Sequence, residues 1–372
     1  MGSHQHSSRH DSARSRSSRS GHSHHHHRKG PIRVLKHNIK KQLRKHTWLG
    51  PTVIVAVIIL IAVGFWMFHT VQTTRGKRLT AGNQVNVGSS YRDIVYKGKE
   101  YRYNSLITTV LYAGLDSKGE LKPHNLYGMA SPADSISLIV MDEFNKKMTI
   151  IAINRNTIAR YNKYTIGGTP RGTFKDQLCL AYSYGEGGVI SCQNLVGAVS
   201  DLMYGIPIKQ YVISNLSSLP EIAKAIGDVT VTVPNNDLAD RGYIEGNTAV
   251  INADNLEMFV RSRDIGVDFS VLGRMERQRA YINAATGKLM DLFKNKTSEM
   301  WRLLESLEYC VQTNITRSQY IDLTNALAKT AYNEQDYYSP EGKMVIGSKY
   351  EEFYTDEEKL LEKIIDIFYV EK

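Results

Sequence analysis

A long uncharged segment constrains this chain more than any other feature. The stretch from Trp48 to Phe68 contains 21 residues without one charged side chain. A helix of that length spans a hydrocarbon core of roughly 30 Å. The segment is longer than a signal-peptide core and lies far from residue 1, so we predict a retained transmembrane helix over 48–68. More Lys and Arg precede it than follow it, which predicts a single-pass protein with a cytoplasmic N-terminus.

The positive charge of the chain is concentrated before this segment. Residues 1–47 hold twelve Lys or Arg side chains against one acid, Asp11, while the whole chain carries a net charge of +10. The remainder is therefore near neutral, and no nucleic-acid partner is expected for it. Because residues 1–47 are also poor in apolar side chains, we predict a disordered basic cytoplasmic tail. Everything after about residue 70 is predicted to be extracellular.

Strand and helix signals alternate after residue 105. Runs rich in β-branched residues predict strands, and segments of helical period lie between or after them. We expect strands at 106–115, 135–141, 148–153, 210–214 and 229–233, and helices at 189–204, 217–226, 253–262 and 274–293. This order predicts an α/β fold, namely a three-layer sandwich with a central mixed β-sheet flanked by helices and preceded by one N-terminal transmembrane helix.

The exported part is predicted to have three sections. Residues 69–104 are expected to form an extracellular connector with accessory strands, and residues 105–295 the main, catalytic domain. Residues 296–372 form a C-terminal helical extension packed on the same domain. This extension has two further helical patterns, a short strand MVIG and a terminal helix, at 298–311, 317–333, 344–347 and 356–368.

Arginines crowd the segment FVRSRDIGVDFSVLGRMERQR, residues 259–279. Like charges repel, so such a cluster is expected where a multiply charged anion lies between guanidinium groups, which bind phosphates bidentately. In an extended segment Arg261 and Arg263 would share a face, and in a helix Arg274 and Gln278 would share a stripe. The cluster therefore predicts a phosphate or pyrophosphate site. The alternative is a solvated, charged helix face.

Two further arginines of this segment are expected to have no part in the site. Arg277 and Arg279 lie about 100° per residue away from the stripe of Arg274 and Gln278. We therefore expect both side chains to be solvated, or paired with acids such as Glu276.

Two aspartates and one arginine are predicted to meet at one edge of the sheet. Asp116 ends the run LYAGLD, Asp134 precedes SISLIVMD, and Arg155 follows the strand MTIIAIN. Carboxylates at adjacent strand ends can share a hard cation such as Mg²⁺, with phosphate oxygens completing its coordination. The alternatives are ordinary turn aspartates or a structural ion pair. Beside the arginine cluster, the set is typical of phosphoryl transfer.

Signals for other chemistry are weak. Two histidines follow the membrane segment, and neither a G-x-S-x-G motif nor a Ser-His-Asp arrangement is visible. GEGG at 185–188 is interpreted as a turn, because it lacks the Lys-Ser/Thr of a phosphate-binding loop. The cysteines fit no metal-binding pattern, and a Cys179–Cys192 disulfide, with Cys310 left over, stays open.

Several segments occur in the order that is typical of a known family. They are GLDS, ADSISLIVMD, TIIAINRNT, LAYSYGEGG, GIPIKQYVI, IGDVTVTVP, and FVRSRD followed by LGRMERQR. Together with the tail and the single anchor, they resemble the LytR-CpsA-Psr family over roughly residues 105–285. The resemblance implies a bacterial envelope phosphotransferase. Such an enzyme moves a glycopolymer (teichoic acid, capsule or secondary wall polysaccharide) from a polyprenyl-diphosphate carrier, held in an apolar tunnel, to peptidoglycan through a phosphodiester.

The resemblance also implies roles for single residues. Catalytic roles fall to Asp116, Asp134, Arg155 and Asp268. The cofactor, Mg²⁺ or alternatively Mn²⁺, would be bound by Asp116 and Asp134. The pyrophosphate would be bound by Arg155, Arg261, Arg263, Arg274 and Gln278. Either Asp264 or Asp268 matches the family's nearby acid. The chain departs from the family's R-D-T pattern with Arg155-Asn156-Thr157, and from its K-x-N pattern with Gln177-Leu178-Cys179.

Three functions are left open by the sequence. The leading one is the glycopolymer transferase, whose partners are the lipid-linked glycopolymer, peptidoglycan and the membrane. Its catalytic domain would lie outside the cell membrane of a Gram-positive-type bacterium. A hydrolase of the same lipid-diphosphate donor would need the same residues. A membrane-tethered regulator of the envelope or of transcription is the alternative from another class.

Overall fold

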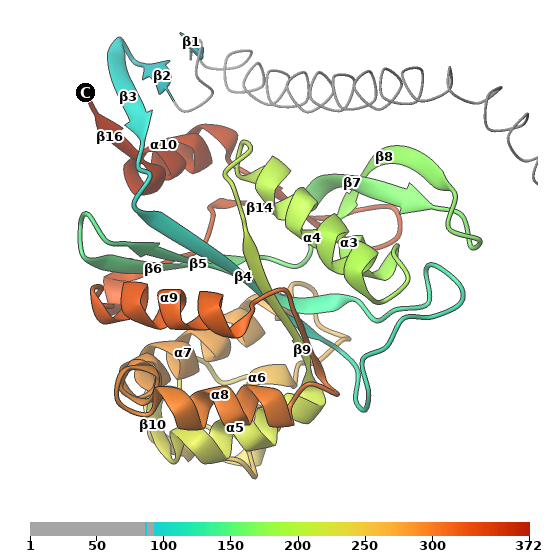
Figure 1. Cartoon of the computed structure of the whole chain (residues 1–372). Coiled ribbons are helices and arrows are strands. Elements are labelled where there is room, and N and C mark those ends of the chain that lie inside the picture. The colour runs from blue at the N-terminus through green and yellow to red at the C-terminus, as the bar shows by residue number, and fades with distance from the viewer. Residues whose placement is uncertain (1–85, 88–92) are drawn as a thin grey trace, which may run out of the picture. The chain divides into compact units, whose positions relative to one another are not determined.

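The computed structural model describes residues 86–87 and 93–372 (Figure 1). The predicted cytoplasmic tail, the predicted transmembrane helix and most of the predicted connector lie outside these residues. Among the helices of the described part, none is long and apolar enough to cross a membrane.

The secondary structure of this part can be stated by residue. The strands are β1 (Asn86–Val87), β2 (Asp93–Tyr96), β3 (Lys99–Tyr103), β4 (Ile107–Leu115), β5 (Ala133–Asp142), β6 (Lys147–Ile153), β7 (Ile158–Tyr164), β8 (Pro170–Gln177), β9 (Gln210–Asn215), β10 (Val229–Thr232), β11 (Thr248–Ile251), β12 (Val311–Thr313), β13 (Tyr337–Tyr338), β14 (Gly342–Ile346), β15 (Glu351–Thr355) and β16 (Tyr369–Glu371). The α-helices are α3 (Leu180–Ser183), α4 (Val189–Leu202), α5 (Leu219–Ile226), α6 (Leu256–Arg261), α7 (Ser270–Asn295), α8 (Thr297–Ser306), α9 (Arg317–Ala328) and α10 (Glu357–Phe368). Short 3-10 helices are η1 (Leu216–Ser218), η2 (Ala239–Arg241) and η3 (Glu334–Asp336).

A mixed sheet forms the centre of the domain. Within residues 93–372 it has six strands in the order β12-β9-β4-β5-β6-β13. β4 pairs antiparallel with β5 and parallel with β9, and β13 pairs parallel with β6. The middle strands are rich in Val, Ile and Leu, as expected for a sheet that is covered on both faces. The predicted α/β class with a central mixed sheet is confirmed, and four of the expected strands are β4, β5, β6 and β9.

Helices cover both faces of this sheet, as Figure 1 shows. Successive side chains of a strand point to opposite faces. Leu111 and Leu138 lie in the hydrophobic cluster that includes residues of α3, α4 and α10. Val110 and Ile150 lie in a second cluster, on the other face, with residues of α7 and α9. Because side chains of these apolar strands point alternately to the two faces, the strands contribute to two separate cores.

One expected strand lies elsewhere. The strand predicted at 229–233 is β10 (Val229–Thr232), which lies outside the central sheet and pairs antiparallel with β11 in a sheet of its own. This pair packs with α5, α6 and α7 around a separate cluster that includes Val229 and Phe259. Its burial alternates strictly between buried and exposed, which suits a ribbon that is covered on one face only. Because α7 also contributes Met290 to the core under the central sheet, it joins the two parts.

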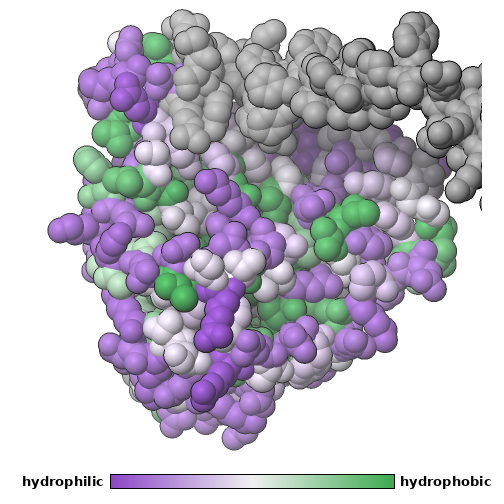
Figure 2. Space-filling model, in the orientation of Figure 1, coloured by the Kyte–Doolittle hydropathy of each residue, from purple (hydrophilic) through white to green (hydrophobic). Residues whose placement is uncertain are grey.

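The C-terminal residues extend the domain at both ends. The part predicted as a helical extension, 296–372, supplies β12 and β13 to the edges of the central sheet. Its last strand, β16, pairs with β3 in a sheet of order β1-β2-β3-β16. The face drawn in Figure 2 is mostly hydrophilic, and its hydrophobic areas are small and separate. Apolar side chains are thus concentrated in the interior.

The central position of β5 can be tested with a pair of leucines. Leu138 is fully buried in β5, whereas Leu106 is 52% exposed. We expect Leu138→Ala to lower the free energy of unfolding by about 2–5 kcal/mol, because it leaves a cavity. Urea denaturation followed by circular dichroism measures the change. Leu106→Ala is the control and should change it by less than about 0.5 kcal/mol; equal losses would contradict this placement.

Candidate functional site

Three side chains predicted to meet at the sheet edge lie at neighbouring strand ends. Asp116 directly follows β4, and its N–H donates to the carbonyl of Pro132 at 3.2 Å, just before β5. Asp134 is the second residue of β5, and Arg155 follows β6 by two residues. Since β5 runs antiparallel to both neighbours, its start and their ends share one edge. The strand pattern therefore predicted this edge correctly.

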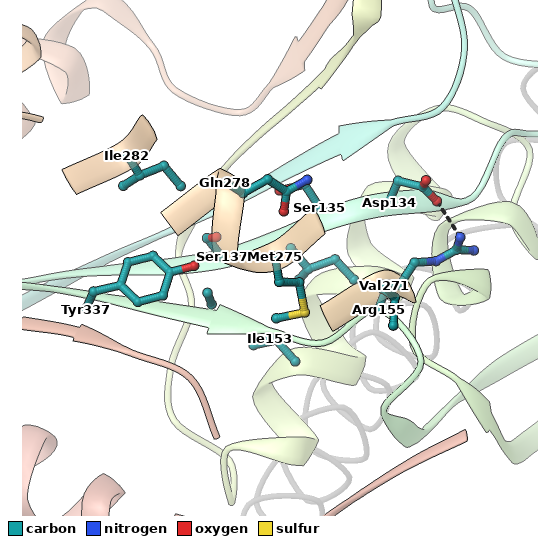
Figure 3. Close-up of a pocket in the computed structure, with 12 residues that line it drawn as sticks. Asp134, Ser135, Ser137, Ile153, Arg155, Val271, Met275, Gln278, Ile282 and Tyr337 are labelled. Carbon is teal, nitrogen blue, oxygen red and sulfur yellow. Dashed lines mark ion pairs between the residues drawn. The ribbon is translucent and has the colours of Figure 1, made fainter. Parts of the chain in front are cut away.

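Asp134 lies between the buried Arg274 and the half-buried Arg155. Its Oδ1 is 2.9 Å from Arg155 Nη1, and its Oδ2 accepts a hydrogen bond of 2.9 Å from Arg274 Nη1. The Arg274 side chain is only 3% exposed. Figure 3 shows Asp134 and Arg155 facing each other at one end of a pocket, with Val271, Met275 and Gln278 of α7 beside them. Asp134 thus joins α7 to the edge of the central sheet.

The hydrogen bonds of this cluster are incomplete. Among the described residues, Arg155 Nε, Arg274 Nε and Asp134 Oδ1 are buried and have no hydrogen-bond partner. Asp134 Oδ1 still forms its ion pair with Arg155, but no donor is aligned with it. A buried donor without an acceptor is unfavourable and uncommon. Two unused guanidinium donors around one carboxylate suit a ligand with several anionic oxygens.

The positive charges around Asp134 also favour an added anion. Burial lowers the pKa of Arg274, Asp134 offsets part of this, and the positive charges of Arg155 and Arg263 lower it further. Burial also acts to lower the pKa of Arg155, but Cys179, Asp134 and Asp116 outweigh it and the pKa is raised. The guanidinium groups are therefore close enough to repel one another. An added anion would relieve that repulsion.

A second ion pair joins the other aspartate to α6. Arg261 donates to Asp116 Oδ1 from Nη2 at 2.6 Å and from Nε at 3.0 Å. The hydrogen bond with Asp116 is the largest cause of the raised pKa of Arg261. Arg261 is the last residue of α6, and the extended backbone begins at Ser262. The expectation of one extended segment carrying Arg261 and Arg263 is therefore wrong, because the packing of Phe259 and Leu256 continues the helix to Arg261.

Arg277 is a further correction. We expected a solvated side chain or a pair with Glu276, but Arg277 is fully buried. It donates to the carbonyl of Phe259 at 3.0 Å and to that of Ser262, and it forms an ion pair of 2.7 Å with Asp237. These bonds join the end of α6 to α7. Arg277 therefore fixes the segment that carries Arg261 and Arg263, and the stripe pattern alone could not reveal this.

The remaining predicted residues surround this centre. Arg263 donates to Ser270 Oγ at 3.3 Å, and Gln278 donates to the carbonyl of Val260 at 3.0 Å. Asp268 is exposed in the loop before α7, and within residues 93–372 it has no ion pair. Arg279 is exposed, as expected, and lies 5.3 Å from the ring centroid of Tyr337.

A pocket extends from Asp134 and Arg155 between the sheet and α7 (Figure 3). Its walls come from β5, β6, β13 and α7, and they include Ile136, Ile153, Val271, Met275 and Ile282. Its volume of about 10 Å³ leaves room for about one water molecule. A polyprenyl chain would enter here only if α7 and the sheet separated. The pocket adjoins the hydrophobic core between the central sheet and α7.

Two other sequence features are structural. Glu186 of the GEGG segment accepts hydrogen bonds from the N–H groups of Ile190 and Ser191 at the start of α4, so the interpretation as a turn is confirmed. All three cysteines are buried and free, so the Cys179–Cys192 disulfide is not formed. Cys179 was not predicted as a site residue, yet its Sγ accepts a hydrogen bond of 3.2 Å from Arg155 Nη2.

The roles of Arg277 and Arg279 predict opposite effects on stability. We expect Arg277→Ala to lower the free energy of unfolding by about 3–5 kcal/mol, because it leaves buried acceptors and Asp237 without a partner. Arg279→Ala should change it little, because that side chain is exposed. Thermal and urea unfolding of both variants measure the difference. A similar, small loss in both would show that the bonds of Arg277 between α6 and α7 do not stabilise the fold.

Two curated bacterial proteins are similar to this chain in sequence. The Bacillus subtilis (strain 168) polyisoprenyl-teichoic acid–peptidoglycan teichoic acid transferase TagV is 23% identical over 274 residues, 70% of this chain and 62% of the relative. Biofilm regulatory protein A of Streptococcus mutans is 22% identical over 264 residues, 69% of this chain and 60% of the relative. This chain thus spans about three fifths of the length of these curated relatives.

Solved structures are also similar to this chain. The crystal structure of B. subtilis TagV matches with a TM-score of 0.51 and 21% identity, covering 70% of this chain and 96% of that one. A structure of TagT bound to LI-WTA matches with a TM-score of 0.51 and 17% identity, covering 71% and 90%. At these identities the likeness shows a shared fold. A profile of the LytR_cpsA_psr family matches residues 73–365, so the chain belongs to the LytR_cpsA_psr family.

Proposed function

We propose that this protein transfers a glycopolymer from a polyprenyl-diphosphate carrier to peptidoglycan through a phosphodiester bond. One observation carries the proposal: Asp134 lies between Arg155 and Arg274, whose Nε donors are buried and unused, at one end of the pocket between the sheet and α7. Membership of the family supports it, as do the transferase name of TagV and the complex of TagT with LI-WTA. The polymer would be a teichoic acid, a capsule or a secondary wall polysaccharide.

The arginines would bind the diphosphate of this donor. Arg155 and Arg274 supply buried donors, while Arg261 and Arg263 approach from the α6 side. The polyprenyl chain would occupy the pocket and the core between the sheet and α7, after these have separated. Gln278 lines the same pocket and would contact the ligand near the diphosphate. Guanidinium groups are suited to this because they form paired hydrogen bonds with phosphate oxygens.

The two aspartates would bind the divalent cation, Mg²⁺ or Mn²⁺. Asp134 Oδ1 is buried and accepts no hydrogen bond, and Asp116 lies at the end of the adjacent strand, so the donor set fits a hard cation. Within residues 93–372 no group of three or more His, Cys, Asp or Glu gathers at one point, so the ligand and water would complete the coordination. The cation would neutralise the charge that develops on the leaving phosphate.

The transfer itself requires one bond to form and one to break. The acceptor hydroxyl oxygen attacks the phosphorus that carries the polymer, and the bond from that phosphorus to the bridging oxygen breaks. Polyprenyl monophosphate leaves, and Arg155 and Arg274 stabilise its charge. The hydroxyl proton passes to a carboxylate. Asp268 is suited to this, because it is exposed and unpaired within residues 93–372, whereas Asp116 and Asp134 are held by arginines.

The location and the division of the chain are part of the proposal. The single helix at 48–68 would anchor the protein, with the basic tail in the cytoplasm and the domain outside the cell membrane. Residues 105–295 would carry the chemistry, and 296–372 would complete the same three-layer domain. This places the site on the side where peptidoglycan is found.

Product analysis with the full chain in detergent or nanodiscs tests the proposal. A donor with a labelled polymer is incubated with peptidoglycan oligomers, with and without Mg²⁺. Label on peptidoglycan supports a transferase. Label released as free polymer phosphate identifies a hydrolase of the same donor. Donor that stays unchanged, although it binds, contradicts both enzymatic functions.

The arginines are expected to contribute unequally to transfer. Arg263→Ala and Arg274→Lys should each reduce the rate about a hundredfold or more, because a paired contact to a desolvated phosphate is lost. Arg279→Ala is the control and should retain most activity, because its side chain is exposed and does not line the pocket. Initial rates are compared after thermal unfolding has shown that all variants fold. Uniform, mild losses would support a solvated charged surface instead.

Cation and diphosphate are expected to bind cooperatively. Each aspartate is now held by an arginine, so a cation can take the carboxylates most easily when a diphosphate takes the guanidinium groups. We expect Mg²⁺ to tighten the binding of farnesyl diphosphate by about 5–150-fold, measured by calorimetry.

Asp116→Asn is the variant that isolates this effect. At the same Mg²⁺ concentration it should lose most of the tightening, while Arg279→Ala keeps it. An equal response to Mg²⁺ in wild type and Asp116→Asn would mean that the cation acts on the diphosphate in solution and not through Asp116.

A further inference from the structure

A hairpin near the C-terminus contacts both sides of the arginine site. β14 and β15 pair with each other in a sheet of their own. Their attachment to the domain therefore depends on other bonds. Phe353 N–H donates to the carbonyl of Asn156 at 2.9 Å, and Gln177 Nε2 donates to the carbonyl of Glu351 at 2.7 Å. The hairpin is thus fixed to the turn that follows Arg155.

The carboxylate of Glu351 makes a second connection. Its Oε1 accepts a hydrogen bond of 2.6 Å from the N–H of Phe269, and its Oε2 accepts one of 3.3 Å from Asn156 Nδ2. Asn156 is the neighbour of Arg155, and Phe269 immediately precedes α7, which carries Arg274. One half-buried side chain therefore joins the two segments that supply Arg155 and Arg274.

The hydrogen bond between Phe269 and Glu351 stabilises a strained backbone conformation. Phe269 has φ 60° and ψ 17°, a left-handed conformation that costs free energy in a residue other than glycine. Phe269 is the N-cap residue of α7, and its side chain makes no capping hydrogen bond. A negative charge at this end also interacts favourably with the dipole of a 26-residue helix. The Glu351 carboxylate thus compensates for a helix start that the local sequence does not stabilise.

We propose that Glu351 is a positioning residue, which fixes the separation of Arg155 and Arg274 so that both can contact one diphosphate. This rests on the proposed function. It follows from geometry, because a shift of α7 along the sheet would change the distance between the two guanidinium groups. A ligand with two phosphates needs both arginines at a defined spacing, whereas a single phosphate can be bound by one.

The experiment compares two lipids that differ by one phosphate. The full chain in detergent is titrated with farnesyl diphosphate and with farnesyl monophosphate. We expect Glu351→Ala to weaken the diphosphate about tenfold and to leave the monophosphate unchanged. Glu351→Gln keeps the shape of the side chain and should lie between wild type and Glu351→Ala. Hydrogen exchange of residues 262–273 should accelerate in Glu351→Ala.

Glu352 provides the matched control. It is the next residue of β15, and its carboxylate accepts a hydrogen bond from Tyr354 Oη at 2.6 Å; within residues 93–372 it forms no hydrogen bond or ion pair with α7 or Asn156. Glu352→Ala should therefore bind both lipids like wild type. Equal weakening of both lipids by Glu351→Ala, or no weakening, would overturn the positioning role. Wild-type protein that binds neither lipid would instead overturn the proposed function.

Discussion

The ion pairs of Asp134 are the interaction on which the site depends. One carboxylate lies between two guanidinium groups that are largely removed from water. Removing a charge from water is costly, and one carboxylate cannot compensate for two arginines. The Nε donors of Arg155 and Arg274, which are buried and have no hydrogen-bond partner, show that this cost is not offset within the described residues. A further anion would relieve this cost, which supports the proposed binding of a diphosphate.

Helix α7 carries residues with two different tasks. Arg274 faces the sheet edge and Asp134, while Arg277, three residues later, faces α6 and Asp237. The closeness of Asp237 explains why the residue before Arg274 is a glycine. A Cβ on Gly273 would lie 2.0 Å from Asp237 Oδ2. A side chain at this position would push Asp237 away from Arg277. The G-R-x-x-R-Q motif therefore combines an arginine that faces Asp134 at the sheet edge with one that joins α6 to α7.

The sequence predicted those parts of the site that depend on local pattern. Strand ends follow from runs of β-branched residues, so Asp116, Asp134 and Arg155 were placed correctly at one edge. Arg277 was missed because its partners Asn235 and Asp237 lie about 40 residues away, and helical spacing does not say which faces are covered. The short strand β10 was predicted, but its place in a separate sheet was not, although its alternation VTVT indicates a ribbon covered on one face.

The departures from the family pattern have a common structural context. Asn156 and Gln177, where the family pattern has Asp and Lys, form an amide–amide hydrogen bond of 3.1 Å beside Arg155. This neutral pair cannot provide the charge that an Asp–Lys pair would bring to the turn. Here the acid comes from Glu351, nearly two hundred residues later in sequence, and the same carboxylate reaches the start of α7. Glu351 therefore links the turn after Arg155 and the start of α7 to the C-terminal hairpin. The hairpin therefore contacts both segments that carry Arg155 and Arg274, although no local motif in its sequence indicates this.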